Sequence, residues 1–160
     1  MEPGLIPTRL GTFRALIAGA GLRRLVFPDQ PLDAADALGL TPRLTSELDE
    51  FLAGLRRDFT IPLDLRGTPF QRRVWAAVRK VPYGATRTYR EIAEQIGAGQ
   101  AIRAVGAANA ANPVPIVVPC HRLVGTAGDL RGYGGGLGLK ARLLALERGA
   151  AGAVASERHG

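Results

Sequence analysis

The sequence predicts an α+β fold in two parts: a small strand-and-helix domain over residues 1–66, then a mostly helical domain over residues 67–148. Strictly alternating apolar residues occur in the first part, whereas helical spacing preceded by capping residues dominates the second. A chain of 160 residues is long enough for one full domain or two small ones. Residues 149–160 are rich in small side chains, and we expect them to form a flexible tail.

The first part begins with a hairpin signal. Residues 12–18 and 22–27 have the apolar pattern of strands, and Gly19-Ala20-Gly21 joins them. Residues 28–42 show no clear period and are interpreted as a loop. Nothing in this region carries obvious chemistry.

A helix and a third strand should complete this domain. Thr45 or Ser46 is a plausible cap for a helix whose apolar positions are Leu48, Phe51, Leu52 and Leu55. Residues 59–65 alternate between apolar and polar side chains, which favours a strand.

The second part opens with three helices. Thr68 and Pro69 are typical of a helix start, and Thr88 with Glu91 forms a capping-box pattern before the next helix. Gly97 should end that helix, and residues 101–110 should form another. Two short helices joined by a tight glycine-containing turn are the helix-turn-helix pattern. The small residues of the second helix indicate either tight helix packing or close approach to a broad partner.

The only cysteine, Cys120, follows an apolar run over residues 114–118 that predicts a short buried strand. Prolines bound and interrupt this run, so the backbone that carries the thiol should be stiff. Cys120 is either a buried small hydrophobe or a positioned nucleophile. Its basic neighbours His121 and Arg122 favour the nucleophile, because thiolates form beside positive or basic groups.

The net charge of +7 is concentrated around this cysteine. Residues 70–142 carry eleven Lys and Arg residues against three acidic ones, whereas residues 1–69 are nearly balanced. A polyanion, most often nucleic acid, fits this distribution. Ordinary solubilising charge and the arginine preference of a GC-rich genome are the alternatives.

The segment after Cys120 is dense in glycine from Gly125 to Gly136 but lacks the Lys-Ser/Thr ending of a phosphate-binding loop. Its glycines would let the backbone approach a flat ligand closely. A final helix should follow, with Lys140 at its start and Glu147 near its end.

Taken together, these motifs resemble the O6-alkylguanine-DNA alkyltransferases, also called methylated-DNA–protein-cysteine methyltransferases. The resemblance covers residues 68–148 closely and the N-terminal part loosely. Its carriers, in the family's order and spacing, are Phe70, Val74-Trp75, Val81-Pro82-Tyr83-Gly84, Tyr89, Arg103-Ala104-Val105-Gly106, Asn112-Pro113, Pro119-Cys120-His121-Arg122, Gly132-Tyr133 and Gly135-Gly136.

The resemblance implies an RNase H-like N-terminal domain, a winged helix-turn-helix domain and a DNA repair activity. Each molecule would transfer one alkyl group from O6-alkylguanine in double-stranded DNA to its own Cys120, without metal or cofactor, and O4-alkylthymine is a second candidate substrate. By resemblance, His121 ionises Cys120 through a water, and Glu147 orients His121. Taken alone, Glu147 would be read as a solvated acid at a helix end.

The resemblance also assigns DNA contacts. The helix that carries Arg103 would enter the minor groove, and Arg103 would fill the place of the flipped base. Tyr89 would assist the departing guanine at N3, although a packed aromatic is the simpler interpretation, and Asn112 would fix the turn before the active-site strand. The expected DNA-binding residues are Arg103, Ala104, Gly106, Ala107, Tyr89 and Arg122.

The guanine pocket would be lined by Pro115, Val124, Tyr133, Gly134 and Lys140. Many relatives have Ser where this chain has Gly134, so we hypothesise a wider pocket that accepts bulkier alkyl groups. The N-terminal part lacks the Cys and His residues that bind zinc in some relatives, and no zinc is expected.

Two rival functions share some of these features. A non-catalytic lesion-binding or regulatory DNA-binding protein would have the basic helix-turn-helix, but lesion-binding relatives lack the nucleophilic cysteine. A cysteine hydrolase needs a histidine across a cleft, and the only other histidine is His159. A single cysteine, no apolar run long enough for a membrane and no signal-peptide pattern favour a reducing cytoplasm. We expect a monomer.

Overall fold

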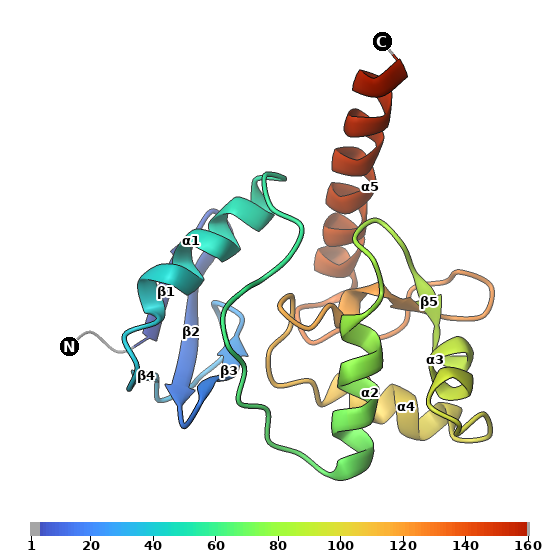
Figure 1. Cartoon of the computed structure of the whole chain (residues 1–160), viewed down its shortest axis with the longest axis horizontal. Coiled ribbons are helices and arrows are strands. Elements are labelled where there is room, and N and C mark those ends of the chain that lie inside the picture. Colours follow the sequence, from blue (N-terminus) through green and yellow to red (C-terminus); the bar gives the residue numbers. More distant parts are fainter. Residues whose placement is uncertain (1–3, 160) are drawn as a thin grey trace. The chain divides into compact units, whose positions relative to one another are not determined.

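The computed structural model describes residues 4–159, with side chains as far as residue 149 (Figure 1). Packing divides the chain into two compact units. One contains the residues up to Arg66 together with Pro113–Val117, and the other contains Gly67–Asn112 and the residues from Val118 onward. The predicted α+β class is confirmed, since strands dominate the first unit and helices the second. The return of Pro113–Val117 to the first unit was not foreseen.

The first unit is built on a small sheet. The central strand β2 (Gly11–Ala18) pairs antiparallel with β1 (Gly4–Thr8) and β3 (Gly21–Val26), and parallel with the short β4 (Ala35–Asp36). The predicted hairpin between β2 and β3 is confirmed. Phe13, Ala15 and Ile17 alternate along β2 and are fully buried, so one face of the strand forms the core.

Helix α1 (Thr41–Leu52) packs against this sheet (Figure 1) and buries Leu44, Leu48, Phe51 and Leu52. The predicted cap at Thr45 or Ser46 is wrong, because the helix already begins at Thr41, with Leu40 at the N-cap position. The Asp36 carboxylate accepts hydrogen bonds from the backbone N–H groups of Leu38, Leu40 and Thr41, and so holds the start of α1.

The third strand predicted over residues 59–65 is also wrong. The segment makes one parallel bridge, between Leu22 and Leu63. The Leu22 N–H donates to the Pro62 carbonyl at 2.8 Å, and the Asp64 N–H donates to the Leu22 carbonyl at 2.9 Å. Pro62 has no N–H to extend the ladder, which explains why the alternation gives a bridge and no strand.

The segment Pro113–Val117 is buried as predicted, but it is not a strand. Val114 and Ile116 are almost fully buried, and the Pro113 carbonyl accepts a hydrogen bond from the Leu25 N–H at 2.8 Å. A turn occupies Ile116 and Val117, and Ile116 has φ of 74°. This left-handed conformation is rare for a β-branched residue and breaks the extended run.

The second unit contains helices α2 (Pro69–Arg79), α3 (Tyr89–Gln95), α4 (Ile102–Ala110) and α5 (Leu137–His159). It also contains the one-turn helix η1 (Cys120–Arg122) and two short parallel strands, β5 (Arg87–Thr88) and β6 (Leu123–Val124). Both predicted N-caps are confirmed, with reciprocal hydrogen bonds between Thr68 and Gln71 and between Thr88 and Glu91.

Helices α3 and α4 form the predicted helix-turn-helix. Gly97 follows α3 with φ of 74°, a conformation that glycine adopts at no steric cost. Helix α4 buries Val105, Ala108 and Asn109, and the Trp75 indole of α2 donates to the Ala108 carbonyl at 2.8 Å. The opposite face of α4 is exposed and, apart from Arg103, consists of small residues.

Helix α5 begins where predicted and is longer than expected. Its backbone continues to His159, whereas the sequence favoured a flexible tail over residues 149–160. The side chains beyond residue 149, and Gly160 itself, lie outside the described part of the chain. Among the helices that the structure describes, none has the length and apolar character needed to cross a membrane.

Candidate active site

Cys120 lies at the start of η1, immediately after Pro119, and its side chain is 5% exposed. Its N–H donates to the Val118 carbonyl at 2.7 Å, and its carbonyl accepts a hydrogen bond from Asn109 Nδ2 at 3.2 Å. The backbone of the cysteine is therefore held from both sides. The predicted strand is replaced by a turn and one helical turn, and these hydrogen bonds hold the backbone that carries the thiol.

Asn112, which the resemblance assigned to the turn after the second helix of the helix-turn-helix, is joined to the cysteine-bearing loop by a hydrogen bond. Its Nδ2 donates to the Val118 carbonyl at 2.8 Å. This bond joins the end of α4 to the residue two positions before Cys120, across the intervening segment. Together with Asn109, it ties the cysteine-bearing loop to α4.

Glu147 of α5 lies at the centre of a buried polar network next to Cys120. Its Oε2 lies 2.6 Å from His121 Nε2, and its two oxygens accept from Arg122 Nε at 2.8 Å and Nη2 at 2.9 Å. The backbone N–H of Gly84 donates to Oε1 at 3.2 Å. His121 and Glu147 are fully buried, so the predicted pairing of these two residues is present in the structure.

Arg122 is placed differently from the prediction. We expected it on the DNA-binding surface, but it is only 5% exposed. It donates two hydrogen bonds to the Glu147 carboxylate and a third, through Nη1, to the Val81 carbonyl at 2.8 Å. Its guanidinium also lies over the Tyr83 ring, 5.6 Å from the centroid. A cation bound in this way has no donor left at the surface, and its role is to fix and neutralise Glu147.

The network sets the protonation states of its members. Burial lowers the pKa of His121 below its ordinary value, although the hydrogen bond and charge of Glu147 act in the opposite direction. Burial alone would raise the pKa of Glu147, but hydrogen bonds from His121 and Arg122 outweigh it, so that pKa is lowered. At neutral pH the site therefore holds a neutral imidazole beside an ionised carboxylate, which is the arrangement a general base requires.

Two tyrosines and a lysine surround the cysteine. Burial and a hydrogen bond with Cys120 hold the pKa of Tyr133 well above its usual value, and burial together with the charge of Cys120 raises that of Tyr89. Lys140 is fully buried, donates to the Arg131 carbonyl at 3.2 Å and lies 5.9 Å from the Tyr89 ring centroid. Burial lowers the pKa of Lys140. These groups are all hydrogen-bond donors at neutral pH.

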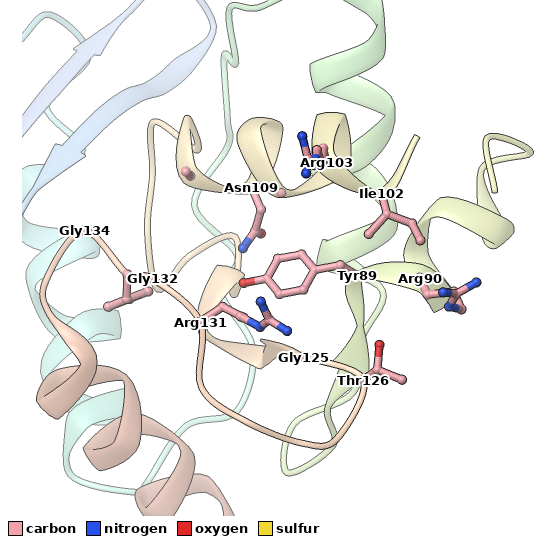
Figure 2. A pocket seen from close by; sticks show the side chains of 13 residues that line it. Tyr89, Arg90, Ile102, Arg103, Asn109, Gly125, Thr126, Arg131, Gly132 and Gly134 are labelled. Atoms are coloured by element: carbon pink, nitrogen blue, oxygen red, sulfur yellow. The ribbon is translucent and has the colours of Figure 1, made fainter. Parts of the chain in front are cut away.

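A cavity of about 500 Å³ opens beside this cluster. Figure 2 shows Tyr89 crossing the space between α4 and the glycine-rich loop, with Asn109 directed toward its hydroxyl. A hydrogen bond with Asn109 partly offsets the raised pKa of Tyr89. The cavity is lined by Tyr89, Arg90, Ile102, Arg103, Gly106, Asn109, Ala110, Gly125, Thr126, Arg131, Gly132, Tyr133 and Gly134.

The cavity includes some of the predicted pocket residues and omits others. Tyr133 and Gly134 line it, as do the expected DNA-binding residues Arg103 and Gly106. Val124 is buried in β6 opposite Thr88, and Pro115 belongs to the first unit. Neither is among the lining residues, and Lys140 lies behind the lining. Ala104 and Ala107 are exposed on α4.

The contributions of Gly84 and Arg131 were missed by sequence reasoning, and Asn109 was considered only as a possible polar contact. Asn109 holds the Cys120 carbonyl, Gly84 donates to Glu147, and Arg131 lines the cavity. In the sequence, the signal that could have pointed to the role of Asn109 is its position, close to Asn112, at the end of a predicted helix. Among the residues that the structure describes, no group of three or more His, Cys, Asp or Glu side chains is placed to hold a metal ion.

A buried cysteine beside a His–Glu–Arg network, carried on a helix-turn-helix unit, defines a candidate thiol nucleophile on a nucleic-acid-binding scaffold. Residues 69–149 match the model of the 6-O-methylguanine DNA methyltransferase DNA-binding domain. The chain therefore belongs to the 6-O-methylguanine DNA methyltransferase family.

Relatives and solved structures agree with this placement. A methylated-DNA–protein-cysteine methyltransferase of Mycolicibacterium paratuberculosis is 62% identical over 102 residues, which cover 64% of this chain and 62% of that protein. One of Methanosarcina acetivorans is 43% identical over 127 residues, covering 79% and 80%. The crystal structure of Mycobacterium tuberculosis OGT in complex with DNA has a TM-score of 0.84 and 43% identity, covering 91% of this chain and 92% of that one. The match to the Mycolicibacterium paratuberculosis protein thus spans somewhat less than two thirds of that relative's length.

Proposed function

We propose that this protein repairs DNA by transferring an alkyl group from O6-alkylguanine to Cys120 in a single, irreversible turnover. The observation that carries the proposal is the 2.6 Å contact between His121 and Glu147, with His121 directly after a buried cysteine. Family membership supports the same activity. O4-alkylthymine is a second candidate substrate, because it presents a similar alkylated oxygen.

The first step is removal of the thiol proton. Neutral His121 accepts it, through a bridging water, and the carboxylate of Glu147 stabilises the imidazolium that forms. Arg122 keeps Glu147 ionised and oriented. The Cys120 thiolate then attacks the alkyl carbon, so that an S–C bond forms while the C–O bond to guanine breaks.

The second requirement is stabilisation of the departing base. The electron pair of the broken C–O bond moves into guanine, and the base takes up a proton or a strong hydrogen bond at N3. Tyr89 is the donor that we assign to this role, because it lines the cavity, and its raised pKa keeps it protonated at neutral pH. Lys140, buried behind Tyr89, contributes positive charge on the same side.

The partner is double-stranded DNA, bound through the minor groove by α4. The exposed face of α4 offers Arg103 beside Ala104 and Ala107, and small residues suit a groove only about 6 Å wide. We assign Arg103 to the place left by the extrahelical base, since a buried cysteine can react only with a nucleotide outside the stack. We further propose that the protein acts as a monomer in the cytoplasm, without zinc or another cofactor.

Intact mass spectrometry tests the transfer. The protein is mixed with a duplex that contains O6-methylguanine, and the Cys120→Ser variant serves as the control. The expected result is the gain of one methyl group on Cys120, no gain in the variant, and no second turnover. Tight binding of the lesion without a mass gain would refute the transfer and favour the rival lesion-binding function.

A further inference from the structure

The loop between β6 and α5 carries an ion pair that the proposed chemistry does not use. Arg131 Nε lies 2.7 Å from Asp129 Oδ2. Both side chains lie against Gly125, where an added Cβ would collide with their charged atoms. The backbone closes the loop beneath them, since the Gly125 N–H donates to the Asp129 carbonyl and the Gly128 N–H to the Gly125 carbonyl, both at 2.8 Å.

The backbone of Arg131 is held from the opposite side as well. Its carbonyl accepts the hydrogen bond from Lys140, which is fully buried and cannot move without opening the core. Arg131 therefore has one anchor on its main chain and one on its side chain. An exposed ion pair of this kind contributes little to stability, so its effect lies in orientation rather than in folding.

The anchored side chain points into the cavity. Figure 2 shows the Arg131 guanidinium below the ring of Tyr89, on the side opposite Arg103. Asp129 occupies the Nε edge, which leaves the terminal nitrogens of the guanidinium for another acceptor. Arg90 and Arg103 line the same cavity, whereas none of its lining residues is acidic. The cavity is thus complementary to an anion.

We propose that Arg131 binds a backbone phosphate of the lesion-bearing strand, next to the nucleotide that enters the cavity. The proposal rests on the proposed function, since it needs that nucleotide to occupy the space beside Tyr89. A planar guanidinium held in one orientation matches two phosphate oxygens, and little side-chain freedom is lost on binding. Arg131 is thereby a DNA-positioning residue contributed by the glycine-rich loop, separate from the exposed face of α4.

The salt dependence of DNA binding tests this contact. Dissociation constants are measured at several KCl concentrations for a duplex with one O6-methylguanine, in a Cys120→Ser background that cannot consume the lesion. Loss of one phosphate contact reduces the slope of log K against log salt by about 0.9. Arg131→Ala should show this reduction, and Arg131→Lys should keep the slope of the parent. Arg142→Ala is the matched control, because Arg142 is an exposed arginine of α5 outside the cavity lining.

Two results of the salt titration would count against the phosphate contact. An unchanged slope for Arg131→Ala would overturn the proposal, as would an equal reduction for Arg142→Ala, which would indicate a bulk charge effect. Thermal unfolding of each variant checks that the fold is retained. The binding measurement requires no alkyl transfer, so it judges this inference even if the mass experiment disproves the proposed function.

Discussion

The two units each bury a glutamate that ties a helix to a loop, but the partners differ in kind. In the first unit, Glu47 of α1 accepts from the backbone N–H groups of Thr60 and Ile61 at 3.0 and 3.1 Å and from the Thr60 hydroxyl, with Arg43 and Arg56 nearby. In the second, Glu147 holds a histidine and a bidentate arginine. Both carboxylates are almost inaccessible to solvent.

The comparison shows that burial of a carboxylate does not by itself mark an active site. In both glutamates, hydrogen bonds outweigh the burial that would raise the pKa, and both pKa values are lowered. The partners of Glu47 are backbone N–H groups, a hydroxyl and two arginines, none of which serves as a proton acceptor, so its network fastens the loop to α1. Glu147 contacts His121, the one partner that can accept a proton at neutral pH, and His121 adjoins the only cysteine.

The largest expected effect is that of Glu147→Gln. The substitution removes the charge that supports protonated His121 and leaves Arg122 as a buried, unpaired cation. We expect the transfer rate of the folded protein to fall by up to about 10⁴-fold, and the free energy of unfolding to fall by about 3–5 kcal/mol. Single-turnover rates and urea unfolding measure the two losses separately. A variant that transfers at the parent rate would contradict the role of the network.

Glu47→Gln should have the opposite pattern of effects, a loss of stability without a loss of alkyl transfer. It should lower the free energy of unfolding by about 1–3 kcal/mol at pH 7, because the N–H groups of Thr60 and Ile61 lose a charged acceptor, and leave the transfer rate of the folded protein unchanged. Because the folded-state pKa lies below the ordinary value of 4.5, this stabilisation is present above pH 4.5 and lost as the pH falls through the folded-state pKa. Urea unfolding at several pH values checks this. A difference that grows on acidification would contradict it.

Tyr89→Phe should have a smaller effect that falls on the reaction alone. Removing the hydroxyl leaves the ring in the cavity but deletes the donor to the departing base, so we expect a loss of about 10²-fold in the single-turnover rate. Binding of the lesion duplex, measured by fluorescence anisotropy, should change little. If binding weakened as much as the rate, Tyr89 would be a packing residue instead.

Gly134→Ser addresses the shape of the cavity and should have the smallest effect. The added hydroxymethyl group narrows the space that Gly134 leaves in the lining. We expect transfer of a benzyl group to slow several-fold relative to transfer of a methyl group, since the larger group would be overpacked in the narrowed space. Competition between the two lesions measures the ratio. A strong preference of the parent for methyl would contradict the hypothesis of a wide pocket.

Local signals in the sequence were sufficient for some elements and misleading for others. The N-cap at Thr68 and the capping box at Thr88 were predicted because the residues that signal each of them lie within four positions of one another. The strands predicted over residues 59–65 and 114–118 do not form, because Pro62 lacks a donor and Ile116 adopts a left-handed conformation. Apolar patterns report burial in both segments but not the backbone path that achieves it.

The residues of the candidate active site were likewise predicted only in part from the sequence. Cys120 and His121 were identified from adjacent residues, and Glu147 only through the resemblance. Burial of Arg122 could not be predicted, because its partners Glu147 and Val81 lie 25 and 41 residues away. The anchors of Arg131 likewise depend on how the glycine-rich loop folds back on itself.

The pH dependence of the single-turnover transfer rate tests directly whether His121, within the Glu147 network, removes the Cys120 proton. His121 accepts a proton only when neutral, and burial lowers its pKa below the ordinary 6.5. With saturating lesion duplex, the rate should therefore be constant near pH 7 and fall on acidification with a midpoint below 6.5. A rate that instead rises through a midpoint near 8.5, the ordinary pKa of a free thiol, would show that the network does not activate Cys120.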